Sequence, residues 1–193
     1  MRIAELKGVH GIKQSPVGVA AKEIGDRVDS TNAWEKFKFE LEELGFEELG
    51  SGGYGIVFER PGYPWVFKVF NNDPGYMAYL NYVIHHQNLS AVPKIKGRPI
   101  RINNNTYAVR MEPLYKLRSE LAWELNNAPT DGLKSSEYKE FVVMIEQHWP
   151  DVATVLADLP NITGKFKLYL DLHDENVMQR ADGTPVITDP LIV

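Results

Sequence analysis

Residues 50–55 place four glycines within six positions, between a Phe-Glu-Glu-Leu segment that begins at Phe46 and the β-branched run Ile56–Glu59. A Pro-Gly turn follows, and after it comes the apolar segment Trp65–Phe70. Enrichment in β-branched and aromatic residues on both sides of a Pro-Gly turn favours antiparallel strands over a helix. The expected order is therefore strand, glycine loop, strand, turn and strand.

A glycine loop between two strands excludes two familiar nucleotide-binding loops. In a dinucleotide-binding fold the glycine loop opens a helix after a strand, whereas here a strand and a turn follow. A Walker phosphate loop ends in Gly-Lys-Ser or Gly-Lys-Thr, and no such run ends this segment. What remains is a glycine flap, whose backbone N–H groups can approach the β- and γ-phosphates of a nucleotide because no side chains intervene.

Lys68 stands in the middle of the apolar segment Val66–Phe70. The period of a strand places Val66, Lys68 and Phe70 on one face, so the ammonium shares that face with apolar neighbours. An unpaired ammonium in such a place is costly, and an anionic partner such as nucleotide phosphate would offset the cost. We therefore expect Lys68 to bind phosphate.

Asp171, Asn176 and Asp189 are the other polar residues whose spacing indicates chemistry. Asp171 and Asn176 stand five positions apart, and Asp189 follows a hairpin signalled by the Asp182-Gly183 turn. Because a hairpin returns the chain to its starting end, the three side chains are expected to converge. Two oxygen ligands, Asn176 and Asp189, suit Mg²⁺, which takes few protein ligands together with phosphates and waters. Asp171 is then available to accept the proton of an attacking hydroxyl.

The remaining periodicities predict helices and two further hairpins. The apolar stripe from Tyr138 to Trp149 is interpreted as core. The expected elements are helices from Ser30 or Thr31 to Gly45 and over 74–88, 114–126 and 135–156, with hairpins of 95–102 with 106–111 and of 177–180 with 185–189.

Composition excludes several classes of protein. The 193 residues are 44% hydrophobic and 24% charged, and they contain no cysteine, which excludes disulfides, thiolate metal sites and a thiol nucleophile. The net charge of -5, with no Lys/Arg cluster longer than a pair, argues against direct nucleic-acid binding. The longest apolar run, Phe141–Ile145, is far too short for a membrane helix, and residues 1–9 lack the apolar stretch of a secretory signal. The expected location is the cytoplasm, with no membrane partner.

Together these residues resemble the protein-kinase signature set. The matching segments are G-x-G-x-x-G-x-V at Gly50–Val57, Lys68 within Val-Phe-Lys, D-L-x-x-x-N at Asp171–Asn176, and Asp189. The order and the spacings agree with that set. The string Arg110–Leu114 also resembles a kinase hinge.

More closely, the chain resembles the early serine/threonine kinase of short-tailed lytic bacteriophages over about residues 34–191. The segments that carry this likeness are Leu49–Gly52, Asp73-x-Gly75, Asp171-Leu172-His173-x-x-Asn176 and Ile187–Pro190.

The resemblance implies a role for each matching residue. Lys68 pairs with the α- and β-phosphates of ATP, Asp171 orients the substrate hydroxyl, and Asn176 and Asp189 hold Mg²⁺. Met111 is the implied gatekeeper, and Glu112 and Leu114 are implied backbone contacts to adenine. ATP and Mg²⁺ are the implied cofactors, and the flap that covers ATP comprises Gly50, Ser51, Gly52, Gly53, Tyr54, Gly55 and Val57.

Departures from the kinase pattern leave alternatives open. The helix expected at 74–88 has no glutamate to pair with Lys68, for which Asp73 is a candidate substitute. Tyr169-Leu170 precede Asp171 in place of His-Arg, and Pro190 follows Asp189 without an activation segment. A pseudokinase-type module that captures or inhibits a host protein without phosphotransfer is the main alternative. The Asp-Leu-His pattern also resembles aminoglycoside and choline phosphotransferases.

The expected fold is α+β: a truncated two-lobed protein-kinase-like fold with an antiparallel N-lobe sheet and helix and a reduced, mostly helical C-lobe. Residues 1–30 are expected as an N-terminal extension, 31–112 as the N-lobe, and 113–193 as the C-lobe with the catalytic loop and the metal-binding hairpin. The implied function is an ATP- and Mg²⁺-dependent serine/threonine kinase, made early by a phage and acting in the host cytoplasm. Implied substrates are host proteins, such as the transcription or RNA-processing machinery, and the kinase itself.

Overall fold

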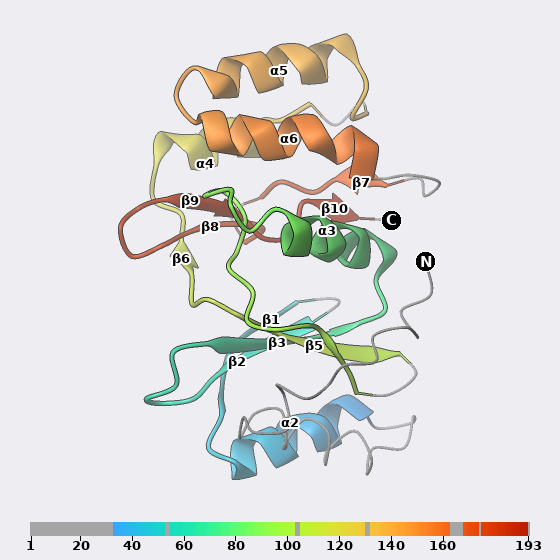
Figure 1. Ribbon diagram of the computed structural model, residues 1–193, viewed down its shortest axis with the longest axis vertical. Helices are drawn as coiled ribbons and strands as arrows, with labels where there is room; N and C mark the ends of the chain where they lie inside the picture. The colour runs from blue at the N-terminus through green and yellow to red at the C-terminus, as the bar shows by residue number, and fades with distance from the viewer. Residues whose placement is uncertain are drawn as a thin grey trace. The chain divides into compact units, whose positions relative to one another are not determined.

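The computed structural model describes residues 33–52, 55–102, 105–129, 132–162, 168–173 and 175–192 (Figure 1). These residues form two compact units, each with its own hydrophobic core. The first unit holds the described residues up to Asn72 and the segment Lys96–Met111, and the second holds Asp73–Ile95 and the described residues from Glu112 onward. The expected N-lobe included residues 73–95, which the structure groups with the second unit. The expected N-terminal extension lies outside the described residues.

The described residues of the first unit form a helix and an antiparallel sheet. The helix α2 (Ala33–Glu43) ends where Gly45 adopts a left-handed conformation with φ 78°, as expected of a helix-stopping glycine. The sheet has the strand order β1-β2-β3-β5-β4. Its strands are β1 (Glu47–Gly52), β2 (Gly55–Glu59), β3 (Val66–Asn71), β4 (Ile100–Arg101) and β5 (Thr106–Met111).

The core of the first unit lies on one face of this sheet. Alternate residues Phe67 and Val69 of β3 are fully buried there with Phe58 of β2, and Leu41 of α2 belongs to the same cluster. Because side chains alternate across a strand, Lys68 belongs to the opposite face, as the strand period predicts. At the edge strand β1, Glu48 forms an ion pair with Lys38 of α2.

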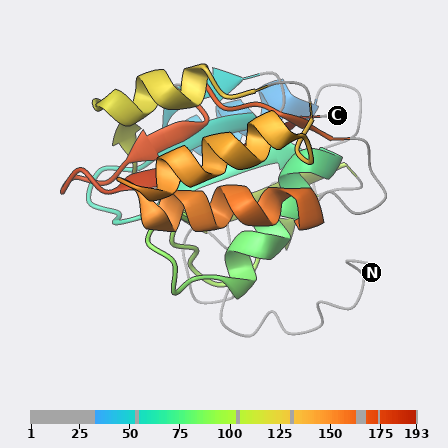
Figure 2. The same cartoon turned by 90° about the horizontal axis from the view of Figure 1, so that it is seen from above.

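In the second unit, the described residues form four helices, a three-stranded sheet and a two-stranded ribbon. Its core comprises buried residues from α3, α5 and α6, and Figures 1 and 2 show α5 and α6 side by side. The helices are α3 (Pro74–His85), α4 (Glu120–Asn126), α5 (Ser136–Glu146) and α6 (Pro150–Ile162). The sheet is β6-β8-β9 and the ribbon is β10-β7, with strands β6 (Tyr115–Lys116), β7 (Tyr169–Leu170), β8 (Val177–Gln179), β9 (Pro185–Ile187) and β10 (Leu191–Ile192).

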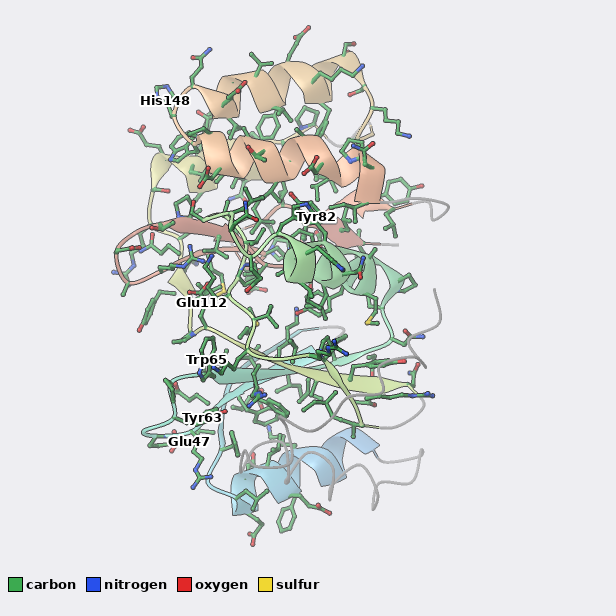
Figure 3. All side chains as sticks on the ribbon, in the orientation of Figure 1. Glu47, Tyr63, Trp65, Tyr82, Glu112 and His148 are labelled. Atoms are coloured by element: carbon green, nitrogen blue, oxygen red, sulfur yellow. The ribbon has the colours of Figure 1, made fainter. Side chains whose placement is uncertain are left out.

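The helix α3 is fastened at both ends. Asp73 caps its N-terminus, because the Asp73 carboxylate accepts from the N–H groups of Gly75 and Tyr76, and Pro74 occupies the first helical position. In the second half of the helix, the hydroxyl of Tyr82, labelled in Figure 3, donates to the Asp158 carboxylate of α6 at 2.8 Å. Contacts with α6 and β10 explain why this helix groups with the second unit.

Two of the predicted helices differ from the structure. The helix expected at 135–156 is two helices, because Pro150 has no N–H to continue α5 and instead opens α6. The helix expected at 114–126 begins only at Glu120, since Tyr115–Lys116 pair with β8 as a strand. The stripe interpreted as core is confirmed: Tyr138, Phe141 and Ile145 are buried.

The α+β class and the antiparallel sheet of the first unit are confirmed, as are both further hairpins, β4-β5 and β8-β9. No helix within the described ranges has the length and apolar character needed to span a bilayer.

Candidate active site

Asp171 and Asn176 are joined through their side chains in the segment between β7 and β8. The amide nitrogen Nδ2 of Asn176 donates to the Asp171 carboxylate oxygen Oδ2 at 3.0 Å and to the Asp171 carbonyl oxygen at 2.9 Å. The chain turns between them because the N–H groups of Asn176 and Val177 both donate to the carbonyl oxygen of His173. Since the amide nitrogen is committed to Asp171, the amide oxygen is the group that Asn176 can offer to a cation.

His173 stands beside this pair. Its Nε2 lies 2.9 Å from Asn176 Nδ2 and 3.7 Å from Asp171 Oδ2, while its Nδ1 accepts from the Glu175 N–H at 3.2 Å. A ring that contacts both side chains restricts the rotamers that they can adopt. This position suits a residue that orients the side chains of Asp171 and Asn176, and Glu175 takes part through its backbone.

Asp189 follows β9, and the residues on either side of it bond to the Asp171–Asn176 segment. The N–H and the hydroxyl of Thr188 donate to the Asn176 carbonyl oxygen at 2.8 and 2.9 Å. The carbonyl oxygen of Pro190 accepts from the Asp171 N–H at 2.9 Å. The main chain therefore brings Asp171, Asn176 and Asp189 into one part of the second unit, as the hairpin argument predicts.

The charge of Asp189 acts on a buried tyrosine of α3. Burial first, and then the negative charge of Asp189, raise the pKa of the Tyr76 hydroxyl well above its ordinary value. Asp189 thus lies near the face of α3 that carries Tyr76. No sequence pattern indicated this neighbourhood.

The donor set of this part of the chain fits Mg²⁺. An amide oxygen from Asn176 and a carboxylate from Asp189 are hard oxygen ligands, and Mg²⁺ is commonly held by one or two such groups together with phosphate oxygens and waters. Within the described residues, no group of three or more histidine, aspartate and glutamate side chains gathers as a cage for a metal ion. The arrangement therefore suits a cation that arrives with a phosphate ligand.

Lys68 occupies the middle of β3 in the first unit. It pairs with Val57 of β2 and with Val109 of β5, and its side chain is half-buried. A Cβ placed on Gly55 would lie 3.6 Å from the Lys68 Cε and 2.8 Å from the Val69 carbonyl oxygen. The absence of a side chain at Gly55 therefore permits the close approach of the Val69 carbonyl, while the stem of Lys68 lies at ordinary contact distance.

The glycine flap is more regular than expected. Gly50, Ser51 and Gly52 belong to β1, and Gly55 and Val57 belong to β2, so the strands extend through most of the predicted loop. The pairing of Gly50 with Val57 and of Gly52 with Gly55 makes this region a hairpin. A Cβ on Gly50 or Gly52 would meet nothing within 4 Å. These glycines thus present open backbone; Gly53 and Tyr54 lie outside the described residues.

Met111, Glu112 and Leu114, the residues expected to form a hinge, lie at the end of β5 and directly after it. Met111 is the last residue of β5 and is buried, and Leu114 is half-buried. The Glu112 N–H donates to the Lys94 carbonyl oxygen at 3.0 Å, and the Glu112 carboxylate pairs with Arg180 (Figure 3 labels Glu112). With its N–H engaged, Glu112 can meet adenine through its backbone carbonyl.

Asp73 has a structural role in this chain. Its carboxylate oxygen Oδ1 caps α3 at 2.7 Å from the Gly75 N–H. The sequence singled out Asp73 as a substitute for the missing helix glutamate, and that substitution stays a prediction, because Asp73 and Lys68 belong to different units.

Arg180 is the residue that sequence reasoning missed. It lies directly after β8 and bonds to Glu112, which precedes it by 68 positions, and to two backbone carbonyls of the segment after α3. The only available signal was a glutamate in the hinge string, which requires a cationic partner if it is buried.

Comparison with known proteins shows the family. A search of the curated proteins finds no match. The solved structure of the Cydia pomonella granulovirus kinase PK-1 is 14% identical with a TM-score of 0.43, and the alignment covers 80% of this chain but only 57% of that one. The sequence profile described as bacteriophage T7 protein kinase 0.7 matches residues 18–192. The expected resemblance to a phage protein kinase is thereby confirmed, and the chain belongs to the bacteriophage T7 protein kinase 0.7 family.

Proposed function

We propose that the protein is an ATP- and Mg²⁺-dependent serine/threonine protein kinase. The observation that carries the proposal is the bonding of Asn176 to both the carboxylate and the carbonyl of Asp171, with the residues that flank Asp189 bonded to the same segment. This arrangement supports one carboxylate held as a proton acceptor and two oxygen groups held beside it for a cation. Membership of a protein-kinase family supports the same reading.

Each residue then has a defined task. Asp171 accepts the proton of a serine or threonine hydroxyl as that oxygen bonds to the γ-phosphorus and the bond to ADP breaks. Asn176 restrains the Asp171 carboxylate through its amide nitrogen and, with Asp189, would hold Mg²⁺. Lys68 would bind the α- and β-phosphates, and the open backbone of β1 would cover them. When bound, Mg²⁺ supplies charge neutralisation on the phosphates.

We expect the substrates to be proteins of the bacterial host, including its transcription or RNA-processing machinery, and the kinase itself. The support is membership of a phage kinase family. Incubation with host extract and γ-labelled ATP would display such targets as labelled bands.

The direct test compares the wild-type protein with Asp171→Asn and with a matched control, Glu175→Gln. Glu175 is exposed in the same loop, and only its backbone bonds to His173. We expect Asp171→Asn to lower phosphotransfer by at least about 100-fold, the usual contribution of a general base, while Glu175→Gln keeps wild-type activity. Equal labelling of substrate by wild type and by Asp171→Asn would overturn the proposal. Chelation of Mg²⁺ should abolish labelling in the active proteins.

A second function, capture of a host protein without phosphotransfer, is favoured by one observation. The helix α3 has no glutamate, and Asp73, the substitute that the sequence offered, is committed to capping that helix. This function predicts that Lys68→Ala and Asp189→Ala retain partner capture and that the wild type transfers no label. Loss of the biological effect in both variants would argue for the kinase.

A further inference from the structure

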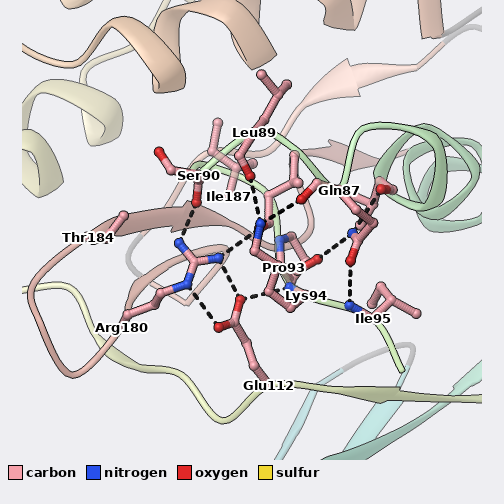
Figure 4. Close-up of polar contacts among 12 residues, drawn as sticks. Gln87, Leu89, Ser90, Pro93, Lys94, Ile95, Glu112, Arg180, Thr184 and Ile187 are labelled. Carbon is pink, nitrogen blue, oxygen red and sulfur yellow. Dashed lines mark hydrogen bonds and ion pairs between the residues drawn. The ribbon is translucent and has the colours of Figure 1, made fainter. Parts of the chain in front are cut away.

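Arg180 lies at the centre of a half-buried polar cluster in the second unit (Figure 4). Its guanidinium donates to both oxygens of the Glu112 carboxylate, from Nε to Oε2 at 2.9 Å and from Nη2 to Oε1 at 2.6 Å. The same guanidinium donates to the carbonyl oxygens of Ser90 and Val92. The side chains of Arg180 and Glu112 are only 17% and 16% exposed. A forked, charge-assisted pair that is shielded from water holds a single geometry.

Glu112 is held from the other side as well. Its N–H donates to the Lys94 carbonyl oxygen at 3.0 Å, and its Oε1 accepts from the Lys94 N–H at 2.7 Å. Lys94 is itself fixed, because its ammonium donates to the carbonyl oxygens of Gln87 and Leu89. Both the main chain and the side chain of Glu112 are therefore restrained, and this restraint sets the direction of its carbonyl group.

The chain after Glu112 is restrained by the β8-β9 hairpin, whose first strand directly precedes Arg180. Tyr115 and Lys116 pair with Gln179 and Met178 of β8, and the Gln179 side chain accepts from the Arg118 N–H at 3.1 Å. Leu114 thus lies between one residue held by Arg180 and another held by β8. At its other end the hairpin joins Asn176 to Thr188, next to Asp189.

From these contacts we infer that Arg180 is a positioning residue for nucleotide binding. The Arg180–Glu112 pair aligns the backbone of Glu112–Leu114 for adenine and attaches it to the hairpin that carries the proposed Mg²⁺ ligands. This inference rests on the proposed use of ATP. Without Arg180, the Glu112 carboxylate keeps only the Lys94 N–H as a donor, and the Ser90 and Val92 carbonyls lose the guanidinium, so the Glu112 side chain would turn toward water.

The test measures ATP affinity in two ways: KM against kcat in phosphotransfer, and the Kd of a fluorescent ATP analogue, which requires no chemistry. We expect Arg180→Met to raise KM and Kd by roughly tenfold or more, with kcat within about twofold of wild type. The KM and Kd of Arg180→Lys should lie between those of the wild type and those of Arg180→Met, because an ammonium keeps the charge but cannot form the forked pair with Glu112. Arg118→Met removes an exposed cation from the neighbouring segment and should behave as wild type.

A double variant separates positioning from stability. Arg180→Met/Glu112→Leu also removes the carboxylate that Arg180→Met leaves without its cation, so the double variant should recover folding stability. If Arg180→Met alone does not fold, the double variant replaces it in the affinity measurements. We expect its KM and Kd to stay raised. Recovery of ATP affinity together with stability, or an unchanged KM and Kd in Arg180→Met, would overturn the inference.

The analogue distinguishes this inference from the proposed kinase activity. If the wild type binds the analogue but transfers no phosphate, the proposed function fails and the Kd values alone decide the role of Arg180. If the wild type binds no nucleotide, both are wrong.

Discussion

Gly55 and Lys68 lie on the paired strands β2 and β3, and the close approach of these strands depends on the missing side chain of Gly55. The position of a Cβ on Gly55 is within 2.8 Å of the Val69 carbonyl oxygen and 3.6 Å of the Lys68 Cε. Gly50, in the same flap, faces open space instead. Two glycines that look alike in the sequence therefore serve different purposes: Gly55 permits the pairing of β2 with β3, and Gly50 leaves its backbone accessible.

This difference is testable with one added methyl group at each position. Gly55→Ala should lower the free energy of unfolding by about 1–3 kcal/mol, because the Val69 carbonyl oxygen must move, and the shift of β3 next to Lys68 should also raise KM for ATP. Gly50→Ala should change the free energy of unfolding by less than about 0.5 kcal/mol while raising KM for ATP. Urea unfolding and steady-state kinetics measure the two effects. Equal stability losses in both variants would contradict the distinction.

The helix α3 is the element that most directly supports Asp189. Gly75 in its first turn lies against the segment after Asp189, since a Cβ there would come within 2.5 Å of the Leu191 carbonyl oxygen. One turn later, the Tyr79 hydroxyl donates to the Ile187 carbonyl oxygen at 2.8 Å, just before Asp189. The helix thus holds the Asp189 segment on both sides, which is a role for α3 that needs no glutamate.

Gly75→Ala tests this support. Alanine favours a helix over glycine by about 1 kcal/mol, so propensity alone predicts stabilisation. We expect destabilisation of about 1–3 kcal/mol instead, because the new methyl group must push α3 away from β10, and we expect phosphotransfer to fall with it. Urea unfolding measures the stability of this variant and of a control, Asn81→Ala, at an exposed position on the same helix. The control should be stabilised; stabilisation of Gly75→Ala as well would show that the contact is unimportant.

At the scale of the whole molecule, the second unit buries several tyrosines that must remain neutral. Burial raises the pKa of Tyr76, Tyr79 and Tyr138 above the ordinary value of 10.0, and the Tyr138 hydroxyl donates to the Leu156 carbonyl oxygen at 2.8 Å. In the unfolded chain these hydroxyls ionise near pH 10.0. Above that pH the folded state binds more protons than the unfolded state, so stability falls as pH rises.

The loss of folding stability at alkaline pH should therefore begin above about pH 10, and its steepness should depend on the number of buried tyrosines. Tyr79→Phe removes one such group, so its free energy of unfolding should fall less steeply with pH between about pH 9 and about pH 11 than that of the wild type. At neutral pH this variant should be about 1 kcal/mol less stable, because the Ile187 carbonyl loses its donor. Urea unfolding at several pH values measures both effects. Tyr115→Phe, at a 55% exposed tyrosine, should keep the wild-type slope. If the free energy of unfolding fell equally steeply with pH in all three proteins, Tyr79 would not be a source of the alkaline loss of stability.

Local sequence patterns were sufficient for much of this molecule. The strands around the glycines, the hairpin at Asp182-Gly183 and the stop at Gly45 depend on side-chain period and backbone preference within a few residues, and the structure contains each of them. The same local order placed Asp171 and Asn176 five positions apart in one turn, where their side chains meet. The break at Pro150 was missed, since one helix was expected over 135–156, although proline cannot continue a helix.

Tertiary structure alone decided the contacts between distant segments. Arg180 and Glu112 are 68 positions apart, and Tyr79 and Ile187 are 108 apart. Neither pair leaves a periodic signal in the sequence, because nothing in the local sequence of either partner marks it. The two partners need each other only once packing has excluded water from around them. The sequence by itself therefore determined the elements and the identity of the candidate reactive groups. Packing decided which residues hold those groups in place, because the cost of an unpaired buried polar group appears only once the chain has folded.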